Sequence, residues 1–111
     1  MPISLEARPR TIVLYLREDG GSPFQEWMES YDRQKVHGII LARIRRVENG
    51  NFGNCEPVGE GVSELKIDFG PGYRVYFGQD GDEVVLLCGG TKATQGQDIR
   101  TAKEYWRDYN A

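Results

Sequence analysis

The sequence has 111 residues, of which 39% are hydrophobic and 28% charged, and its formal net charge is −3 at pH 7. A chain of this length and composition builds one domain with its own core, which excludes whole-chain disorder. No apolar stretch approaches the ~18 residues of a membrane span, and the first residues lack a signal peptide's apolar segment, so we expect a single cytoplasmic domain over residues 1–111.

The two cysteines, Cys55 and Cys88, match neither a metal-site spacing nor a secreted disulfide scaffold. We therefore expect a loop thiol at Cys55 and a buried thiol at Cys88, with no metal and no cofactor.

The first half of the chain predicts a strand followed by a helix. Residues 11–17 are apolar and β-branched, which favours a strand. Ser22 and Pro23 are typical of a helix start, and this helix should end near Tyr31. Three residues at helical spacing should mark its buried side: Phe24, Trp27 and Met28.

A second, longer helix is expected from a cap at Asp32 to about Asn49. Its inward positions at helical spacing are Val36, Ile40, Arg43, Ile44 and Val47. From residue 33 to 46 the chain carries only basic charges, namely Arg33, Lys35, Arg43, Arg45 and Arg46. This run either creates a local positive field for an anionic ligand or is simply a solvated helix face. Residues 50–61 are predicted to form a loop.

Three strands are predicted next, over residues 64–69, 73–78 and 83–88, joined by a Gly-Pro-Gly turn and by Asp80-Gly81. A last helix should begin near Thr94, with Gln97 completing a capping box. Tight turns would place Phe77 opposite both Leu65 and Val84.

In that register one sheet face is apolar and packs on helices, whereas the other carries Lys66, Asp68, Arg74 and Tyr76. Lys66 and Arg74 would be diagonal neighbours about 7–8 Å apart. Asp68 would lie opposite Arg74. Lys92 follows the last strand at the same end of the sheet, although its direction does not follow from the pattern.

Cations at one end of a sheet favour a phosphate site, since arginine offers a planar fork and lysine a point charge. Lys66, Arg74 and Lys92 are thus candidate catalytic residues for RNA cleavage by its own 2′-hydroxyl group. Tyr73 or Tyr76 could stack on a base. The structural alternative is an Asp68–Arg74 ion pair with no chemical task.

Two segments have a distinctive sequence: residues 61–77, which include Gly-Pro-Gly-Tyr-Arg-Val-Tyr-Phe, and residues 86–95, which include Cys-Gly-Gly-Thr-Lys. Through these segments the chain resembles the RelE/HigB-type toxins of bacterial toxin–antitoxin modules, in the branch of phage-derived or addiction-module killer proteins. The resemblance covers about residues 11–109.

The resemblance implies an α+β fold of the RelE-like microbial ribonuclease type: an antiparallel sheet of three to five strands, two N-terminal helices on one face and a C-terminal helix. It further implies metal-independent cleavage of mRNA, usually on the ribosome, and a helix-turn-helix antitoxin as partner. By position, Arg74 matches the family's phosphate-binding arginine, and Lys66 and Lys92 match its basic residues on the preceding strand and after the last strand. Arg43 and Arg46 are further RNA-binding candidates.

The chain also departs from that family, because it is acidic overall and offers no matching general base near its C-terminus. Two rival functions therefore stay open. One is a ParE-type toxin that binds and poisons DNA gyrase without cutting RNA, and the other is an inactive remnant.

Overall fold

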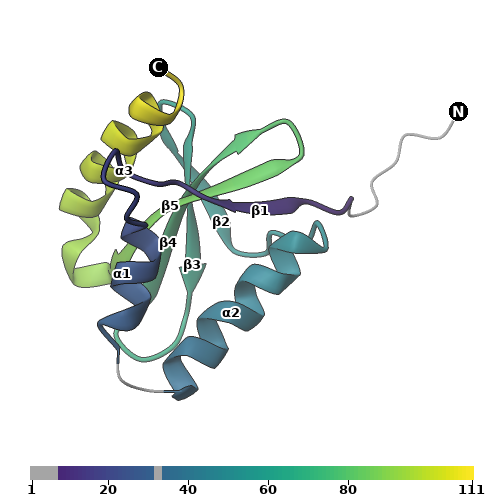
Figure 1. Ribbon diagram of the computed structural model, residues 1–111. Coiled ribbons are helices and arrows are strands. Elements are labelled where there is room, and N and C mark those ends of the chain that lie inside the picture. The colour runs from purple at the N-terminus through teal and green to yellow at the C-terminus, as the bar shows by residue number, and fades with distance from the viewer. Residues whose placement is uncertain (1–7, 32–33) are drawn as a thin grey trace, which may run out of the picture.

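The computed structural model describes residues 8–31 and 34–111, and it has an α+β fold in which one five-stranded sheet carries helices on both faces (Figure 1). In chain order the elements are β1 (Thr11–Leu14), α1 (Pro23–Glu29), α2 (Gln34–Glu48), β2 (Cys55–Gly59), β3 (Val62–Ile67), β4 (Tyr73–Asp80), β5 (Glu83–Thr91), a short 3₁₀ turn (Lys92–Thr94) and α3 (Gln95–Tyr109). The predicted cap at Asp32 and the basic residue Arg33 lie outside the described residues. In the part of the chain that the structure describes, no helix is both long and apolar enough to cross a membrane.

The sheet is mixed, with the strand order β1-β5-β4-β3-β2. β1 runs parallel to β5, while the other neighbours are antiparallel, so the prediction of a wholly antiparallel sheet was wrong for one strand.

β2 was predicted to be loop, because Pro57 and Gly59 are poor strand residues. It forms an edge strand, where a proline is tolerated since its missing N–H costs no ladder bond.

The predicted β3–β4 register is wrong by two residues. Leu65 faces Val75 instead of Phe77, and Lys66 faces Arg74 directly, so the Asp68–Arg74 pair does not form. The link is a five-residue loop, 68–72, rather than a tight Gly-Pro-Gly turn. Because a shift by an even number of residues leaves every side chain on its face, the predicted face assignment survives.

The β4–β5 hairpin shows a similar shift. Asp80 pairs with Glu83, so the two turn residues are Gly81 and Asp82, with Gly81 at φ +62°. The shifted turn places Phe77 opposite Leu86, not opposite Val84, and a bulge between Tyr76 and Phe77 then pairs Tyr76 with Cys88.

Helices α1 and α2 cover one face of the sheet, as the sequence predicted. The Ser22 hydroxyl oxygen accepts the Gln25 N–H at 3.1 Å, which confirms the predicted start of α1. The core on this face combines helix residues and strand residues: Phe24, Met28, Val36, Ile40, Ile44, Val47, Leu65, Ile67, Tyr73, Val75, Phe77, Val84 and Leu86.

Helix α3 covers the opposite face, which carries Lys66, Arg74 and Tyr76 and for which the sequence predicted no covering helix. Its Ala102 is fully buried in a second core with Val62, Tyr76, Val85, Leu87, Cys88 and Tyr15. The C-terminal part of α3 is tied down by the Tyr15 hydroxyl, which donates to Asp108 Oδ2 at 2.6 Å. The predicted capping box at Thr94 is wrong, since the Thr94 side chain caps no α3 amide and donates instead to Asp98.

Candidate functional site

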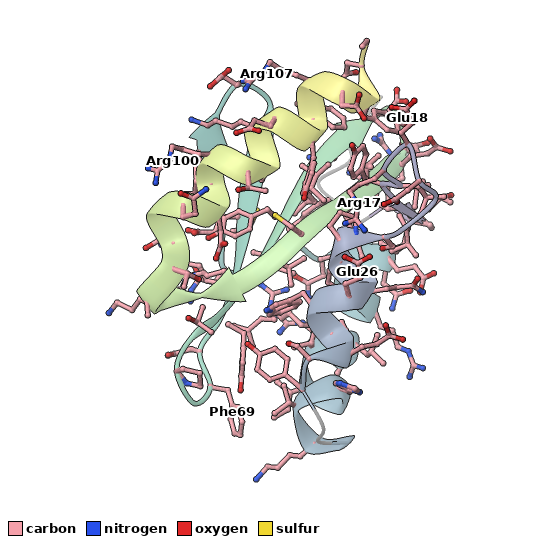
Figure 2. The ribbon with its side chains drawn as sticks, turned by 60° about the vertical axis from the view of Figure 1, so that its left-hand side comes forward. Arg17, Glu18, Glu26, Phe69, Arg100 and Arg107 are labelled. Carbon is pink, nitrogen blue, oxygen red and sulfur yellow. The ribbon has the colours of Figure 1, made fainter. Side chains whose placement is uncertain are left out.

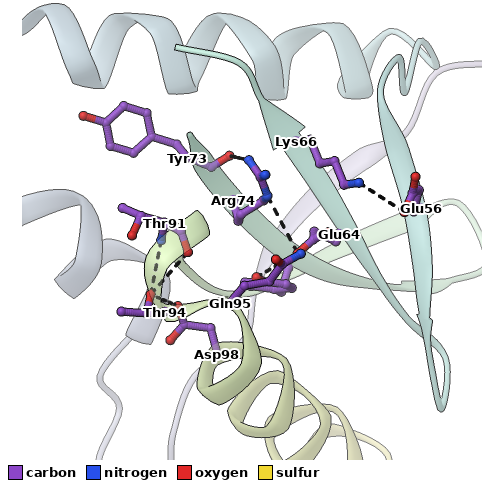
Figure 3. A network of polar contacts seen from close by, with 10 residues as sticks. Glu56, Glu64, Lys66, Tyr73, Arg74, Thr91, Thr94, Gln95 and Asp98 are labelled. Atoms are coloured by element: carbon purple, nitrogen blue, oxygen red, sulfur yellow. Dashed lines mark hydrogen bonds and ion pairs between the residues drawn. The ribbon is translucent and has the colours of Figure 1, made fainter. Parts of the chain in front are cut away.

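Lys66 and Arg74 face each other across β3 and β4, on the side of the sheet that α3 covers (Figure 3). Like charges in directly opposite positions repel, so this pair needs nearby acidic groups. Lys66 Nζ lies 3.1 Å from Glu56 Oε2 on β2, and Arg74 Nε lies 3.9 Å from Glu64 Oε2 on β3. The two cations are therefore each matched by a separate carboxylate, which alternating strand positions bring to the same face.

Glu64 is the buried centre of this arrangement, with 1% of its surface exposed. Its Oε2 accepts the Tyr76 hydroxyl at 2.9 Å and the Gln95 side-chain amide at 2.7 Å (Figure 3). A buried carboxylate is costly unless it is paired and hydrogen-bonded, and these two donors with the Arg74 guanidinium meet that need. Burial and, second, the hydrogen bond to Glu64 raise the pKa of Tyr76 well above its ordinary value, so this phenol keeps its proton and stays a donor.

Arg74 is itself only 9% exposed. Its Nη1 donates to the Tyr73 carbonyl oxygen at 3.2 Å, whereas its buried Nε has no hydrogen-bond partner among the described residues. An unpaired charged N–H in a buried position carries a desolvation penalty that an anion would remove. Arg74 thus keeps a buried N–H that could donate to a phosphate oxygen.

Gly72 brings Arg74 and Lys92 to the same end of the sheet. Its carbonyl oxygen accepts the Lys92 backbone N–H at 2.8 Å. A Cβ on Gly72 would lie 3.3 Å from Arg74 Nη1 and 3.5 Å from Lys92 Cβ, and the backbone there has φ +81°. The backbone conformation at this position therefore favours glycine. The Lys92 side chain is exposed, so this cation can reach a ligand from solvent.

The other predicted RNA-binding residues lie elsewhere. Arg43 is 8% exposed and its Nη2 donates to the Phe52 and Asn54 carbonyl oxygens, so it holds the 50–54 loop rather than RNA. Arg46 is exposed, but on α2, across the sheet from Arg74. The second core buries Tyr76, and no base can stack on it in this conformation.

Tyr73 is buried too, on the opposite face of the sheet. It packs edge-on against Trp27 and Tyr31 of the first core, with ring centroids 6.4 and 5.4 Å away. Its prediction as an RNA-stacking residue is therefore wrong for this conformation.

The sequence analysis missed Glu64 and Gln95, which complete the site. A signal existed for Glu64, because it stands two positions before Lys66 and so must share its face. Gln95 gave no comparable signal, since its position depends on how α3 returns across the sheet.

Elsewhere, the two cysteines are free, with Cys88 buried as predicted and Cys55 in β2 rather than in a loop. Within residues 8–31 and 34–111 no three His, Cys, Asp or Glu side chains gather as metal ligands.

Comparison with known proteins gives one informative relative. No family model matches the chain. A protein of Haemophilus influenzae, described as an uncharacterized protein, is 47% identical over 81 residues, which cover 72% of this chain and 82% of that protein. At this identity and coverage the two sequences share a fold and a common origin. The chain belongs to the same family as this Haemophilus influenzae protein.

Proposed function

We propose that the chain is a RelE/HigB-type toxin: an endoribonuclease that cuts mRNA on the translating ribosome and is neutralised by a helix-turn-helix antitoxin. The observation that carries the proposal is the buried Arg74 guanidinium, whose Nε lies 3.9 Å from the Glu64 carboxylate but makes no hydrogen bond, at the same end of the sheet as the exposed Lys92. Cation and carboxylate side by side are what RNA cleavage by an internal 2′-hydroxyl requires.

The proposed reaction assigns one task to each group. Glu64 takes the proton of the 2′-hydroxyl as its oxygen attacks the neighbouring phosphorus. Arg74 stabilises the extra negative charge of the five-coordinate phosphorane. The bond from phosphorus to the 5′-oxygen then breaks, and Lys66 gives a proton to that oxygen. The products are a 2′,3′-cyclic phosphate and a 5′-hydroxyl end, and no metal takes part in this scheme.

Access to Glu64 requires a small movement, because the carboxylate is 1% exposed. The Gln95 side chain covers it from the first residue of α3, donating to the same Oε2 that faces Arg74. Gln95 is half-buried, so its amide can leave without unpacking the Ala102 contact further along the helix. A bound ribose hydroxyl would then replace the amide as the donor to Glu64.

The direct test is induction of the chain alone in a bacterium, followed by primer extension on an abundant mRNA. We expect growth arrest with new in-frame cleavage sites for the wild type, and neither for Arg74→Ala. Arg107→Ala is the matched control, because Arg107 is an exposed arginine on α3 that pairs with Glu60 at 2.9 Å, away from the site. It should cut like the wild type.

A second variant separates chemistry from folding. Glu64→Gln keeps the size and an acceptor oxygen but cannot take a proton, so the variant should stay folded and lose cleavage. If Glu64→Gln cuts mRNA at the wild-type rate, the assignment of Glu64 as the base is wrong. If Arg74→Ala unfolds the protein and Arg74→Lys restores both folding and full cleavage, Arg74 is a structural ion-pair residue.

The burial of the candidate site favours one alternative function. Glu64, Tyr76 and Arg74 are all at least nine-tenths buried, as in a purely structural cluster. The chain would then act as a binding protein, such as a ParE-type toxin that poisons DNA gyrase. Growth arrest with intact mRNA and a DNA-damage response would support this function, and induction without any arrest would indicate an inactive remnant.

A further inference from the structure

Phe69 is an exposed aromatic ring at the same end of the sheet as the candidate site. It lies in the 68–72 loop between β3 and β4, with 37% of its surface exposed. Figure 2 shows its side chain pointing away from the body of the protein. Part of the aromatic ring is therefore open to solvent and available to a ligand.

The loop holds this ring in a fixed position. The Phe69 N–H donates to the Ile67 carbonyl oxygen, and the Gly72 N–H donates to the Phe69 carbonyl oxygen, each at 3.0 Å. Gly70 and Gly72 adopt φ +55° and +81°, conformations that disfavour other residues. A ring that is held rigidly can bind a ligand without a large ordering cost.

A cation lies over the Phe69 ring. Lys35 Nζ of α2 is 5.4 Å from the ring centroid, within cation–π distance. At the other end of the loop the Lys92 backbone N–H donates to the Gly72 carbonyl oxygen, and a Cβ on Gly72 would lie 3.3 Å from Arg74 Nη1. The exposed Asp68 is the acidic neighbour in this loop. A positive side chain beside an aromatic ring, with Arg74 and Lys92 beyond Gly72, matches the alternation of phosphates and bases along a single strand.

We propose that Phe69 and Lys35 form a nucleotide subsite for single-stranded RNA, next to the phosphate held by Arg74 and Lys92. Phe69 stacks on the base and Lys35 binds the following phosphate, so the strand bends around the end of the sheet across Gly72. The proposal rests on the proposed ribonuclease function and adds where the flanking nucleotide lies.

The test uses short RNAs that carry 2-aminopurine, a base whose fluorescence is quenched by stacking, and a 2′-O-methyl group at the cleavage position. The RNAs are offered free and in programmed ribosomes. We expect quenching at one position next to the cleavage site with wild type and with Phe69→Trp. Phe69→Leu keeps an apolar side chain but removes the aromatic face, and should weaken RNA binding roughly tenfold or more.

The controls separate this subsite from the ribonuclease function itself. Leu41→Ala removes another exposed apolar side chain, on α2, and should leave binding unchanged. Lys35→Ala should weaken binding and reduce its salt dependence. If Phe69→Leu binds and is quenched like the wild type while RNA is still cut, the subsite is refuted and the ribonuclease function stands. If the wild type binds RNA in neither form, both proposals fail.

Discussion

Removing the Tyr76 hydroxyl tests how much its hydrogen bond to the buried Glu64 carboxylate stabilises the protein. In Tyr76→Phe the ring stays in the second core, and Glu64 loses the donor at 2.9 Å. Hydrogen bonds to charged groups contribute about 1.5–3 kcal/mol, and solvent cannot replace the donor because both residues are at most 1% exposed. We therefore expect the free energy of unfolding to fall by about 1.5–3 kcal/mol, which lowers the melting temperature by roughly 6–12 °C in a domain of this size.

The assay is urea unfolding at neutral pH, and a second tyrosine serves as control. The Tyr15 hydroxyl also donates to a carboxylate, Asp108, at 2.6 Å, but Asp108 is exposed. Water can replace the lost donor there, so Tyr15→Phe should cost at most about 1 kcal/mol. In a Glu64→Gln background the effect of Tyr76→Phe should shrink, because a neutral acceptor replaces the charged one. The reasoning is refuted if Tyr76→Phe costs no more than Tyr15→Phe, or if its cost is the same in both backgrounds.

Three further predictions concern the two cores. Burial is the main cause that raises the pKa of the Tyr15 phenol and of the Cys88 thiol, each to about 12. Because the folded state holds both protons more tightly than the unfolded state, the free energy of unfolding should be constant at neutral pH and fall as the pH rises above about 9–10. Urea unfolding at a series of alkaline pH values would measure this fall, and an unchanged free energy of unfolding up to about pH 11 would contradict it. Cys88 should react with iodoacetamide at neutral pH only after the protein is unfolded, and peptide mass mapping would detect the modified cysteine. Rapid modification of the folded protein would show that α3 does not cover Cys88. A Cβ at Gly78 would lie 2.5 Å from Trp106, so Gly78→Ala should destabilise the fold by about 1–3 kcal/mol. A Cβ at Gly38 in α2 would meet open space, so Gly38→Ala should stabilise the fold by about 0.5–1 kcal/mol. Equal changes in melting temperature for the two variants would contradict this packing.

The sequence pattern predicted the elements and the sheet faces well, for a physical reason. Alternation along β3 and β4 determines which side chains share a face, whatever the turn between them. The turns were misjudged, but next to each turn the register shifted by two residues, and it becomes odd only beyond the β4–β5 bulge. For that reason Lys66 and Arg74 were correctly predicted to be neighbours, although they are direct partners and not diagonal ones.

What the sequence could not give is the position of α3 over the sheet. A helical pattern can show which side of a helix is apolar, but not which face of the sheet that side meets. That long-range contact decides whether Tyr76 is a stacking surface or a buried donor, and whether Gln95 meets Glu64. The parallel pairing of β1 was missed for the same reason, since it joins segments about seventy residues apart.

The position of β1 beside β5 bears on how the chain reaches this state during synthesis. Thr11 pairs with Glu83, so β1 must stay unpaired until β5 has been made. Contacts this distant in sequence slow folding, and unpaired strand edges promote aggregation meanwhile. The cation pair sits on β3 and β4, but the helix that supplies Gln95 to Glu64 follows both strands in the chain. A nascent chain that does not yet contain α3 would thus carry an incomplete cluster.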